Sequence, residues 1–455
     1  MADIINLLAG IAANDPVDEL RGHRAQAKEN AQLSFEALLE PADQKSVSFR
    51  DRYAVAAFTA GLLGSARAEE FYRDLLRDED ESVSWAVAEL LDEATAPAGT
   101  AGPYGIFESA ALAEENVPGP WLAAADATAA RLGEKLTAGL EFAHLLVLHP
   151  RDSRPGHLAL LLEAGWDEDG IVTLAQLVSF LNFQIRISTG LAALTDAASA
   201  TQSPADAAPS SHDAEDSSAS ARVDEALRAV EDRVKTYPNL HRPELFQQGG
   251  LGWVPWIAPV AEADLSDEQR DALIEAGRAK NPYFRLLARD PAALKARTLT
   301  DFDIFFNTTD GLGRAERELA ATAASRLNGC LFCASVHADR ATEESGRRDV
   351  VQRLLDEGIG TKSHLGDQVW DAVVDASVAL TLTPQAFGVA HVEQLRAAGL
   401  GDGDIIDALS CAAFFNWANR LMLSLGEPEV LKQAGYSSSA DVHERRADDE
   451  AVSRR

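Results

Sequence analysis

Two cysteines and a histidine stand close together in the second half of the chain. Cys330 and Cys333 are separated by two residues, and His337 follows four residues later. In a chain with only three cysteines, a Cys-x-x-Cys pair indicates redox or metal chemistry rather than a disulfide scaffold. At these spacings the three side chains would share one face of a helix.

The preceding residues predict where that helix begins. Asn328-Gly329 is a turn signal, so Cys330 is expected at a helix N-terminus, where the helix dipole stabilises a thiolate. Cys333 and His337 are close enough to meet directly or through one water molecule. Cys330 can form a disulfide with Cys333 if the first helical turn relaxes. The pattern therefore predicts a dithiol, Cys330 and Cys333, with a proton donor beside it.

Length, net charge and cysteine content limit which classes of protein the chain can belong to. A chain of 455 residues exceeds one ordinary domain, and its formal charge of −31 argues against nucleic acid and anionic membranes as partners. The first residues lack a basic signal-peptide region, and no continuous apolar run approaches the ~18 residues of a membrane span. Few cysteines indicate a reducing compartment. We therefore expect a cytoplasmic protein.

Helical periodicity dominates the chain and predicts an all-α fold. Segment 122–148 is expected to be one helix, and helices are expected to fill most of 266–435. Residues 201–221 hold no large apolar side chain and predict a flexible linker, and 437–455 predict a disordered tail. An aromatic segment around Trp253 and Trp256 is expected to be extended and packed onto a neighbouring helix or subunit.

An internal repeat indicates two tandem domains, 1–200 and 222–436. One offset of 234 residues aligns His157 with His391 and continues without a gap into a longer match. That match sets Phe180, Asn182 and Arg186 opposite Phe414, Asn416 and Arg420. We interpret the repeated histidine, asparagine and arginine as structural.

The upstream parts of the two halves correspond at a larger offset. In that register Gly64, Arg67 and Phe71 stand opposite the two cysteines and the histidine. The first half is therefore predicted to be a degenerate copy that lacks every reactive side chain.

The residues around the dithiol resemble those of a known family. Glu316-Arg317-Glu318-Leu319, then Arg326 to Cys333, then His337 are similar to the signature of the AhpD-like alkylhydroperoxidases. These belong to the carboxymuconolactone decarboxylase family of all-helical proteins. The resemblance extends over roughly 280–425 and implies two tandem AhpD-like domains.

The resemblance implies a role for each residue. Cys333 would attack the hydroperoxide, Cys330 would resolve the sulfenic acid as a disulfide, and His337 with Glu318 would form a proton relay. No cofactor or metal is implied, and the partners would be a hydroperoxide and a dithiol protein or small thiol as reductant. One departure is Phe332, because the best-studied branch of the family has a histidine there.

The proton relay requires Glu318 and His337 to lie close together in the fold. In one straight helix, twelve residues would separate Glu318 from Cys330 by about 18 Å. The chain must therefore break its helix at Asn328-Gly329 and bring Glu318 to face His337. Glu316 is the rival for the acidic role.

Other interpretations remain open. A zinc site would need a fourth ligand, for which His364, His391 and Cys411 are candidates without typical spacing. Cys411 is expected in the core. The rival functions are a decarboxylase acting on a lactone acid and a non-catalytic thiol redox sensor or assembly subunit. The family's assemblies imply a homodimer or homotrimer.

Overall fold

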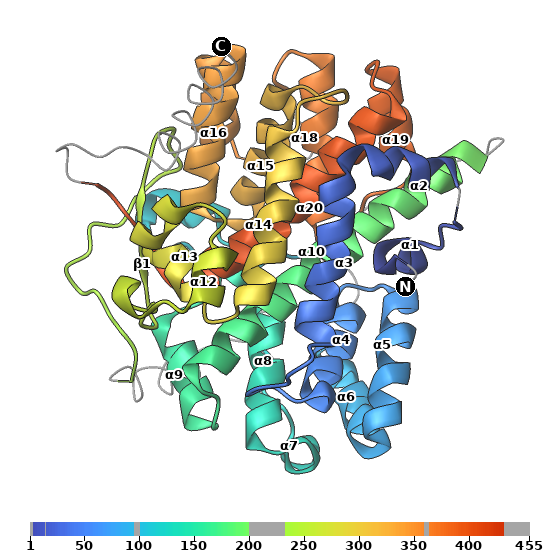
Figure 1. Cartoon of the computed structure of the whole chain (residues 1–455). Helices are drawn as coiled ribbons and strands as arrows, with labels where there is room; N and C mark the ends of the chain where they lie inside the picture. The colour runs from blue at the N-terminus through green and yellow to red at the C-terminus, as the bar shows by residue number, and fades with distance from the viewer. Residues whose placement is uncertain (1–2, 14, 95–100, 200–232, 359–363, 432–455) are drawn as a thin grey trace.

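The computed structural model of the chain describes residues 3–13, 15–94, 101–199, 233–358 and 364–431. These residues form an all-α protein with one small β ribbon (Figure 1). The first part contains α1 (Ile4–Ala9), α2 (Pro16–Arg21), η1 (Gly22–Arg24), α3 (Ala25–Leu39), α4 (Phe49–Leu62), α5 (Ala66–Glu79), α6 (Glu81–Ala94), η2 (Ala110–Glu115), α7 (Asp126–Leu132), α8 (Glu134–Leu148), η3 (Pro150–Asp152), α9 (Pro155–Glu163) and α10 (Glu168–Ser199).

The second part begins and ends with a short strand. It contains β1 (Gly252–Pro255), η5 (Glu262–Asp264), α12 (Asp267–Ala272), η6 (Ala276–Lys280), α13 (Pro282–Leu287), α14 (Pro291–Phe306), α15 (Arg314–Asn328), α16 (Leu331–Ser345), α17 (Arg348–Asp356), α18 (Gln368–Thr381), α19 (Val389–Ala397), α20 (Asp402–Ser424) and β2 (Gly426–Glu429). Strands β1 and β2 pair antiparallel.

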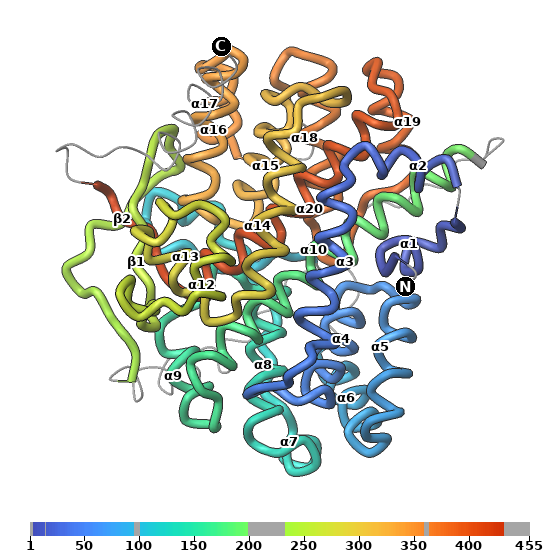
Figure 2. Tube along the Cα trace, viewed as in Figure 1, coloured from blue at the N-terminus to red at the C-terminus, as the bar shows by residue number. Residues whose placement is uncertain are grey.

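The two long helices α10 and α20 pack against each other at the centre of the molecule. Figure 2 shows α4 to α9 gathered on one side of this pair and α15 to α19 on the other. Aromatic side chains join the two helices, since Trp417 stacks on Phe183 at 5.7 Å and meets Phe180 edge-on at 5.1 Å. One continuous hydrophobic core therefore spans both predicted domains.

The repeated histidines, His157 and His391, cap helices in the same way in the two halves. Nδ1 of His157 accepts the backbone N–H of Arg154 at 3.0 Å, and Nδ1 of His391 accepts that of Gly388 at 3.3 Å. Each contact satisfies a free donor at a helix N-terminus, here that of α9 and of α19. The predicted structural role of these histidines is confirmed, and that role is helix capping.

The repeated arginines hold the halves together. The guanidinium of Arg186 donates to its own helix at Asn182 and to the carbonyl of Thr381, at the end of α18. The guanidinium of Arg420 donates to Asn416 and to the carbonyls of Leu146 and Val147, at the end of α8. Each long helix thus binds the carbonyl end of a helix in the other half.

Two glycines with left-handed backbone mark corresponding turns. Gly64 has φ +70° between α4 and α5, and Gly329 has φ +78° between α15 and α16. Aligning the halves on these glycines sets Ser65, Ala68 and Tyr72 opposite the reactive positions. The predicted register, which set Gly64 opposite the first cysteine, is displaced by one residue. The origin of the halves by duplication stays a prediction.

Two local predictions can be compared with the fold. The single helix expected over 122–148 is wrong, because Gly133 has φ +79° and separates α7 from α8. The packed aromatic arm is confirmed. The indole of Trp253 donates to the carbonyl of Met422, and that of Trp256 donates to Glu427, so both rings lie against α20 and β2. The predicted linker 201–221 and tail 437–455 lie outside the described residues.

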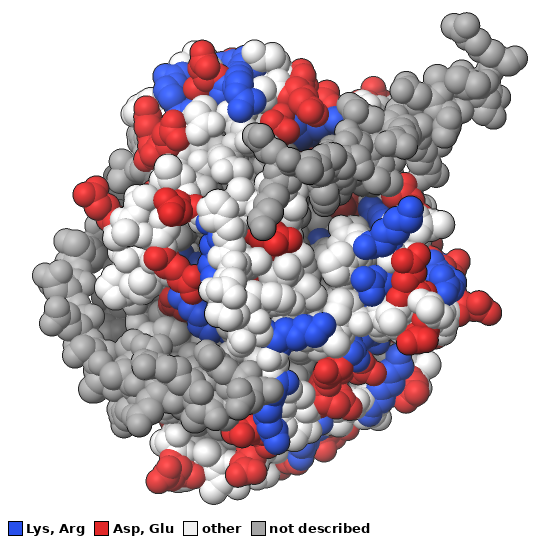
Figure 3. Space-filling view, turned by 90° about the vertical axis from the view of Figure 1, so that its left-hand side faces the viewer, with Lys and Arg blue, Asp and Glu red and all other residues white. Residues whose placement is uncertain are grey.

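Helix α10 is long and apolar enough to cross a membrane by length and composition, but its most apolar window is entirely buried inside the protein. It is therefore the core helix of this fold. The face in Figure 3 carries acidic and basic side chains intermixed around an uncharged area.

Candidate active site

The turn between α15 and α16 builds the site. Helix α15 ends at Asn328, Gly329 takes the left-handed conformation, and α16 begins at Leu331 with Cys330 as its N-cap residue. A residue with a Cβ is strained at φ +78°, so glycine suits this position. The chain reverses here and the two helices pack side by side. The predicted helix break, with the first cysteine at a helix N-terminus, is confirmed.

This reversal brings Glu318 and His337 into contact. A carboxylate oxygen of Glu318 lies in hydrogen-bond contact with Nδ1 of His337, and Nε of Arg314 donates to the other carboxylate oxygen at 2.5 Å. Burial alone would raise the pKa of Glu318. The charges and hydrogen bonds of His337 and Arg314 outweigh burial and hold that pKa below its usual value. Glu318 is therefore a buried carboxylate between two nitrogen partners.

The structure distinguishes Glu318 from its rival. Glu316 lies two residues earlier and accepts the indole N–H of Trp370 at 2.9 Å. Only Glu318 faces the histidine. Arg314, which completes the ion pair, was missed by sequence reasoning. Its spacing of four residues from Glu318 on one helix was the available signal.

The dithiol lies inside the protein. Cys330 is 2% exposed and Cys333 is 4% exposed, and both belong to the main hydrophobic core. Burial raises the pKa of the Cys333 thiol well above its ordinary value, and the neighbouring Cys330 raises it further. The amide of Asn419 and the charge of Arg297 act in the opposite direction. A cysteine so deeply buried needs these contacts to form a thiolate.

A buried amide network holds the turn against α20. The side-chain amide of Asn328 donates to Asn416 at 3.2 Å and to Asn419 at 3.0 Å. Asn419 in turn donates to the hydroxyl of Ser325 at 3.0 Å. Asn416 was singled out from the repeat as structural, and its bonds agree with that role. Asn419 was missed, because a lone asparagine on an apolar helix carries no motif.

Aromatic rings enclose the histidine. The ring of His337 meets Phe415 edge-on at 4.0 Å between centroids and lies 5.6 Å from Phe305. The His337 side chain is 18% exposed, so its edge still reaches solvent. With Nδ1 directed to Glu318, Nε2 is the nitrogen free to exchange a proton with a bound molecule.

The predicted residues thus form two pairs. Glu318 joins His337, and Cys330 joins Cys333. A hydrogen bond from His337 to Cys333 is not among those of the described residues, and the nearby amide of Asn419 lowers the pKa of Cys333. A water or substrate molecule would have to connect the two pairs.

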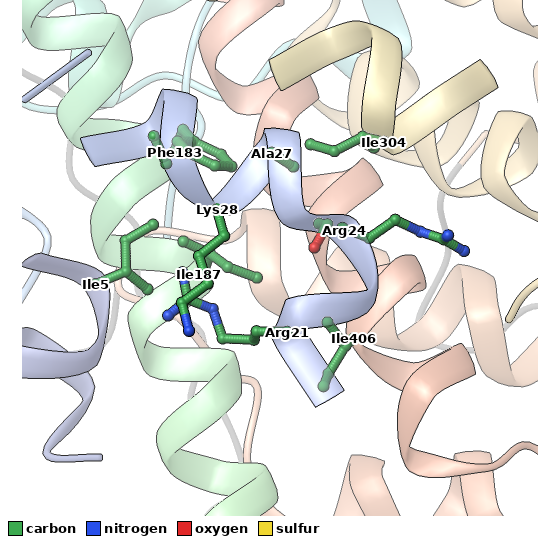
Figure 4. Close-up of a pocket in the computed structure, with 11 residues that line it drawn as sticks. Ile5, Arg21, Arg24, Ala27, Lys28, Phe183, Ile187, Ile304 and Ile406 are labelled. Atoms are coloured by element: carbon green, nitrogen blue, oxygen red, sulfur yellow. The ribbon is translucent and has the colours of Figure 1, made fainter. Parts of the chain in front are cut away.

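Two hollows lie outside the dithiol. A cavity of about 30 Å³ between α1, α3, α10 and α20 is lined by Arg21, Arg24 and Lys28 (Figure 4). These three cations are bound to Asp3, Asp407 and Asp18 respectively, and the space holds about one water molecule. A wider groove of about 500 Å³ is lined by Arg314, Glu316 and Trp370, and therefore reaches the outer partner of Glu318.

The alternative ligands of a zinc site are placed elsewhere. His391 caps α19, and Cys411 is fully buried in α20, where burial raises its pKa well above the ordinary value. Cys411 is therefore a core residue, as expected. Within the part of the chain that the structure describes, no group of three or more His, Cys, Asp or Glu residues is arranged to hold a metal.

Comparison with known proteins gives one match. Residues 291–359 match the model of the carboxymuconolactone decarboxylase family. The matched segment runs from α14 to α17 and contains both cysteines, His337 and Glu318. The chain matches no curated protein and no solved structure.

Proposed function

We propose that the protein is a cysteine-dependent peroxidase that reduces hydroperoxides through a dithiol–disulfide cycle. The observation that carries the proposal is the buried contact between Glu318 and His337 across the Gly329 turn, beside the paired thiols of Cys330 and Cys333. The family match of this segment agrees with it. Acid–base groups next to a thiol pair suit peroxide reduction, which needs a nucleophile, a proton donor and a resolving thiol.

The reaction begins at Cys333. Its thiolate attacks the terminal oxygen of the hydroperoxide, so that an S–O bond forms and the O–O bond breaks. The leaving alkoxide takes a proton from His337, passed directly or through water, and departs as the alcohol. Glu318 accepts the hydrogen bond of Nδ1 and stabilises the histidine when it is charged.

The second step makes the disulfide. The Cys330 thiolate attacks the sulfur of the Cys333 sulfenic acid, an S–S bond forms, and the S–O bond breaks with release of water. An external dithiol then reduces this disulfide by thiol–disulfide exchange and is itself oxidised. Cys330 is the N-cap residue, outside the regular turns of α16, and only the first turn must relax to join it to Cys333.

A turnover assay tests the proposal. Wild-type protein with dithiothreitol and an organic hydroperoxide should consume peroxide, while Cys333→Ser should be inactive. In the absence of dithiothreitol, Cys330→Ser should be oxidised once and then stall as a sulfenic acid. Cys411→Ser changes the remaining thiol and is the matched control, with turnover retained. Unchanged turnover in Cys333→Ser would reject the proposal.

The family match also supports a second candidate, decarboxylation of a lactone acid. That reaction does not depend on a cysteine pair, so Cys333→Ser separates it from peroxide reduction. A protein that forms the disulfide stoichiometrically but never turns over would be a redox sensor instead. We further propose a cytoplasmic homodimer or homotrimer, without nucleic-acid or membrane partners, which sedimentation analysis can check.

A further inference from the structure

One buried arginine has neither a carboxylate nor a carbonyl acceptor among the described residues. Arg297, on α14, is 5% exposed, and its Nε has no hydrogen-bond partner. Its guanidinium lies over the rings of Phe414 at 5.0 Å, Trp417 at 5.9 Å and Tyr283 at 5.9 Å. No ion pair of the described residues includes it. A charge enclosed this way is costly unless something compensates it.

The other buried arginines of the described chain have carboxylate or carbonyl acceptors. Arg52, Arg186 and Arg420 donate to backbone carbonyls. Arg317 and Arg24 share Asp407, and Arg326 binds Glu115. Arg278, on the same side of the protein, stacks over Phe284 and Phe302 and also has Glu275 as a partner. Arg297 therefore stands out, and an anion that is not a carboxylate of the chain is the expected partner.

A second unpaired donor lies next to it. Tyr283, on α13, is 8% exposed, and its hydroxyl has no hydrogen-bond partner. Burial raises the pKa of Tyr283 to about 12, so the hydroxyl keeps its proton at neutral pH. The Arg297 guanidinium lies over the Tyr283 ring at 5.9 Å, so two buried donors without acceptors lie side by side and form a corner suited to negative charge.

The dithiol borders this corner. The rings around Arg297, those of Tyr283, Phe414 and Trp417, belong to the same packed hydrophobic cluster as Cys330 and Cys333. The charge of Arg297 lowers the pKa of Cys333 against burial, and ionised Cys333 would in turn raise the pKa of Tyr283. His337 is already committed to Glu318 through Nδ1. Arg297 is thus the cation available to the thiolate.

We propose that Arg297 and Tyr283 form an anion-binding corner for the charge that develops at Cys333. Arg297 stabilises the thiolate, and the Tyr283 hydroxyl binds the oxygen that a peroxide transfers to the sulfur. Only the second role rests on the proposed peroxidase function. Neither role could be predicted from the sequence, since Arg297 lies 36 positions and Tyr283 lies 50 positions before Cys333.

Two rates separate the roles. In a Cys330→Ser background, Cys333 cannot form the disulfide, so its alkylation by iodoacetamide at pH 8 reports the thiolate, and dimedone trapping after hydrogen peroxide reports oxygen transfer. Peptide mass spectrometry distinguishes Cys333 from Cys411. Arg297→Gln should slow both reactions at least tenfold, about one unit of pKa. Tyr283→Phe should slow oxidation about tenfold and alkylation less than threefold, because alkylation transfers no oxygen.

Matched variants control for general loosening of the core. Arg278→Gln removes a buried arginine that has its own acid, and Tyr72→Phe removes a buried hydroxyl bonded to Gln184. Both should leave the two rates within twofold. Should Arg297→Gln not fold, Arg297→Met places a flexible apolar side chain among the aromatic rings without charge.

The outcomes are distinct. Alkylation of the Arg297 variant within twofold of its parent would overturn the role of Arg297, whether or not peroxide is reduced. Equal slowing of both reactions by Tyr283→Phe, or of neither, would overturn the role of Tyr283. Loss of peroxide chemistry in every variant, with the alkylation effect intact, would reject the peroxidase but leave Arg297 as the thiolate's counter-ion.

Discussion

Replacing Glu318 by Gln perturbs the relay with little change of shape. The carboxylate is 1% exposed in side-chain terms, and its partners Arg314 and His337 are 12% and 18% exposed. Gln keeps an acceptor oxygen but removes the charge that holds both nitrogens. Breaking a buried ion pair costs roughly 3–5 kcal/mol. Because both partners retain some solvent contact, we expect about 3 kcal/mol, the lower end of that range.

The same change should slow the chemistry. Without the carboxylate, His337 loses the group that orients Nδ1 and stabilises its charged form, so turnover should fall about 100-fold, within the usual range for a positioned acid–base group. Urea unfolding measures the first effect and steady-state hydroperoxide reduction the second. Activity is compared without urea, at a temperature at which circular dichroism shows that the variant is folded.

Glu316→Gln is the matched control. It lies on the same helix, keeps its acceptor for Trp370 and does not face the histidine. We expect a change in unfolding free energy below about 0.5 kcal/mol and unaltered turnover. Turnover of the Glu318 variant within about threefold of wild type would refute a catalytic relay, since positioned acid–base groups contribute at least about 100-fold.

Three further predictions follow from the site. Gly329→Ala and Gly346→Ala should each lose about 1–2 kcal/mol in urea unfolding, because both positions are left-handed, but only Gly329→Ala should slow disulfide formation in a thiol-loss assay. Below about pH 4.5, the free energy of unfolding of the wild-type protein should fall more steeply than that of Glu318→Gln. The pKa of Glu318 is lower in the folded than in the unfolded state, so the stabilisation from its carboxylate is present above the unfolded pKa and is lost as pH falls through the folded pKa. Urea unfolding at pH 3 to 7 measures this difference. Alkylation of Cys333 in a Cys330→Ser background should still accelerate above pH 9.0, because burial raises its pKa; a plateau reached at lower pH would contradict this.

Much of the site followed from local sequence. The Asn328-Gly329 turn and the N-cap position of Cys330 were predicted because turn signals and glycine backbone freedom are local rules. The approach of Glu318 to His337 was implied by the family resemblance, and helix length showed only that it required a break at this turn. The roles of these residues in catalysis stay predictions.

The long-range packing around the site could not be predicted from the sequence. Burial of both cysteines depends on α20, which contacts α15 and α16 from some 80 residues away. Arg297 resembles any helical arginine until its neighbours are known, and Asn419 carries no motif. The common core of the two predicted domains was also missed, because the pairing of α10 with α20 leaves no signal beyond a repeated apolar pattern.

The most direct test is a thiol count after one equivalent of hydroperoxide. The reduced chain has three thiols, and we expect rapid loss of two, with a Cys330–Cys333 disulfide found by peptide mass spectrometry and Cys411 still free. The Cys333→Ser variant should lose none at a comparable rate. Retention of all three thiols in the wild-type protein, or a disulfide that includes Cys411, would contradict the proposed function.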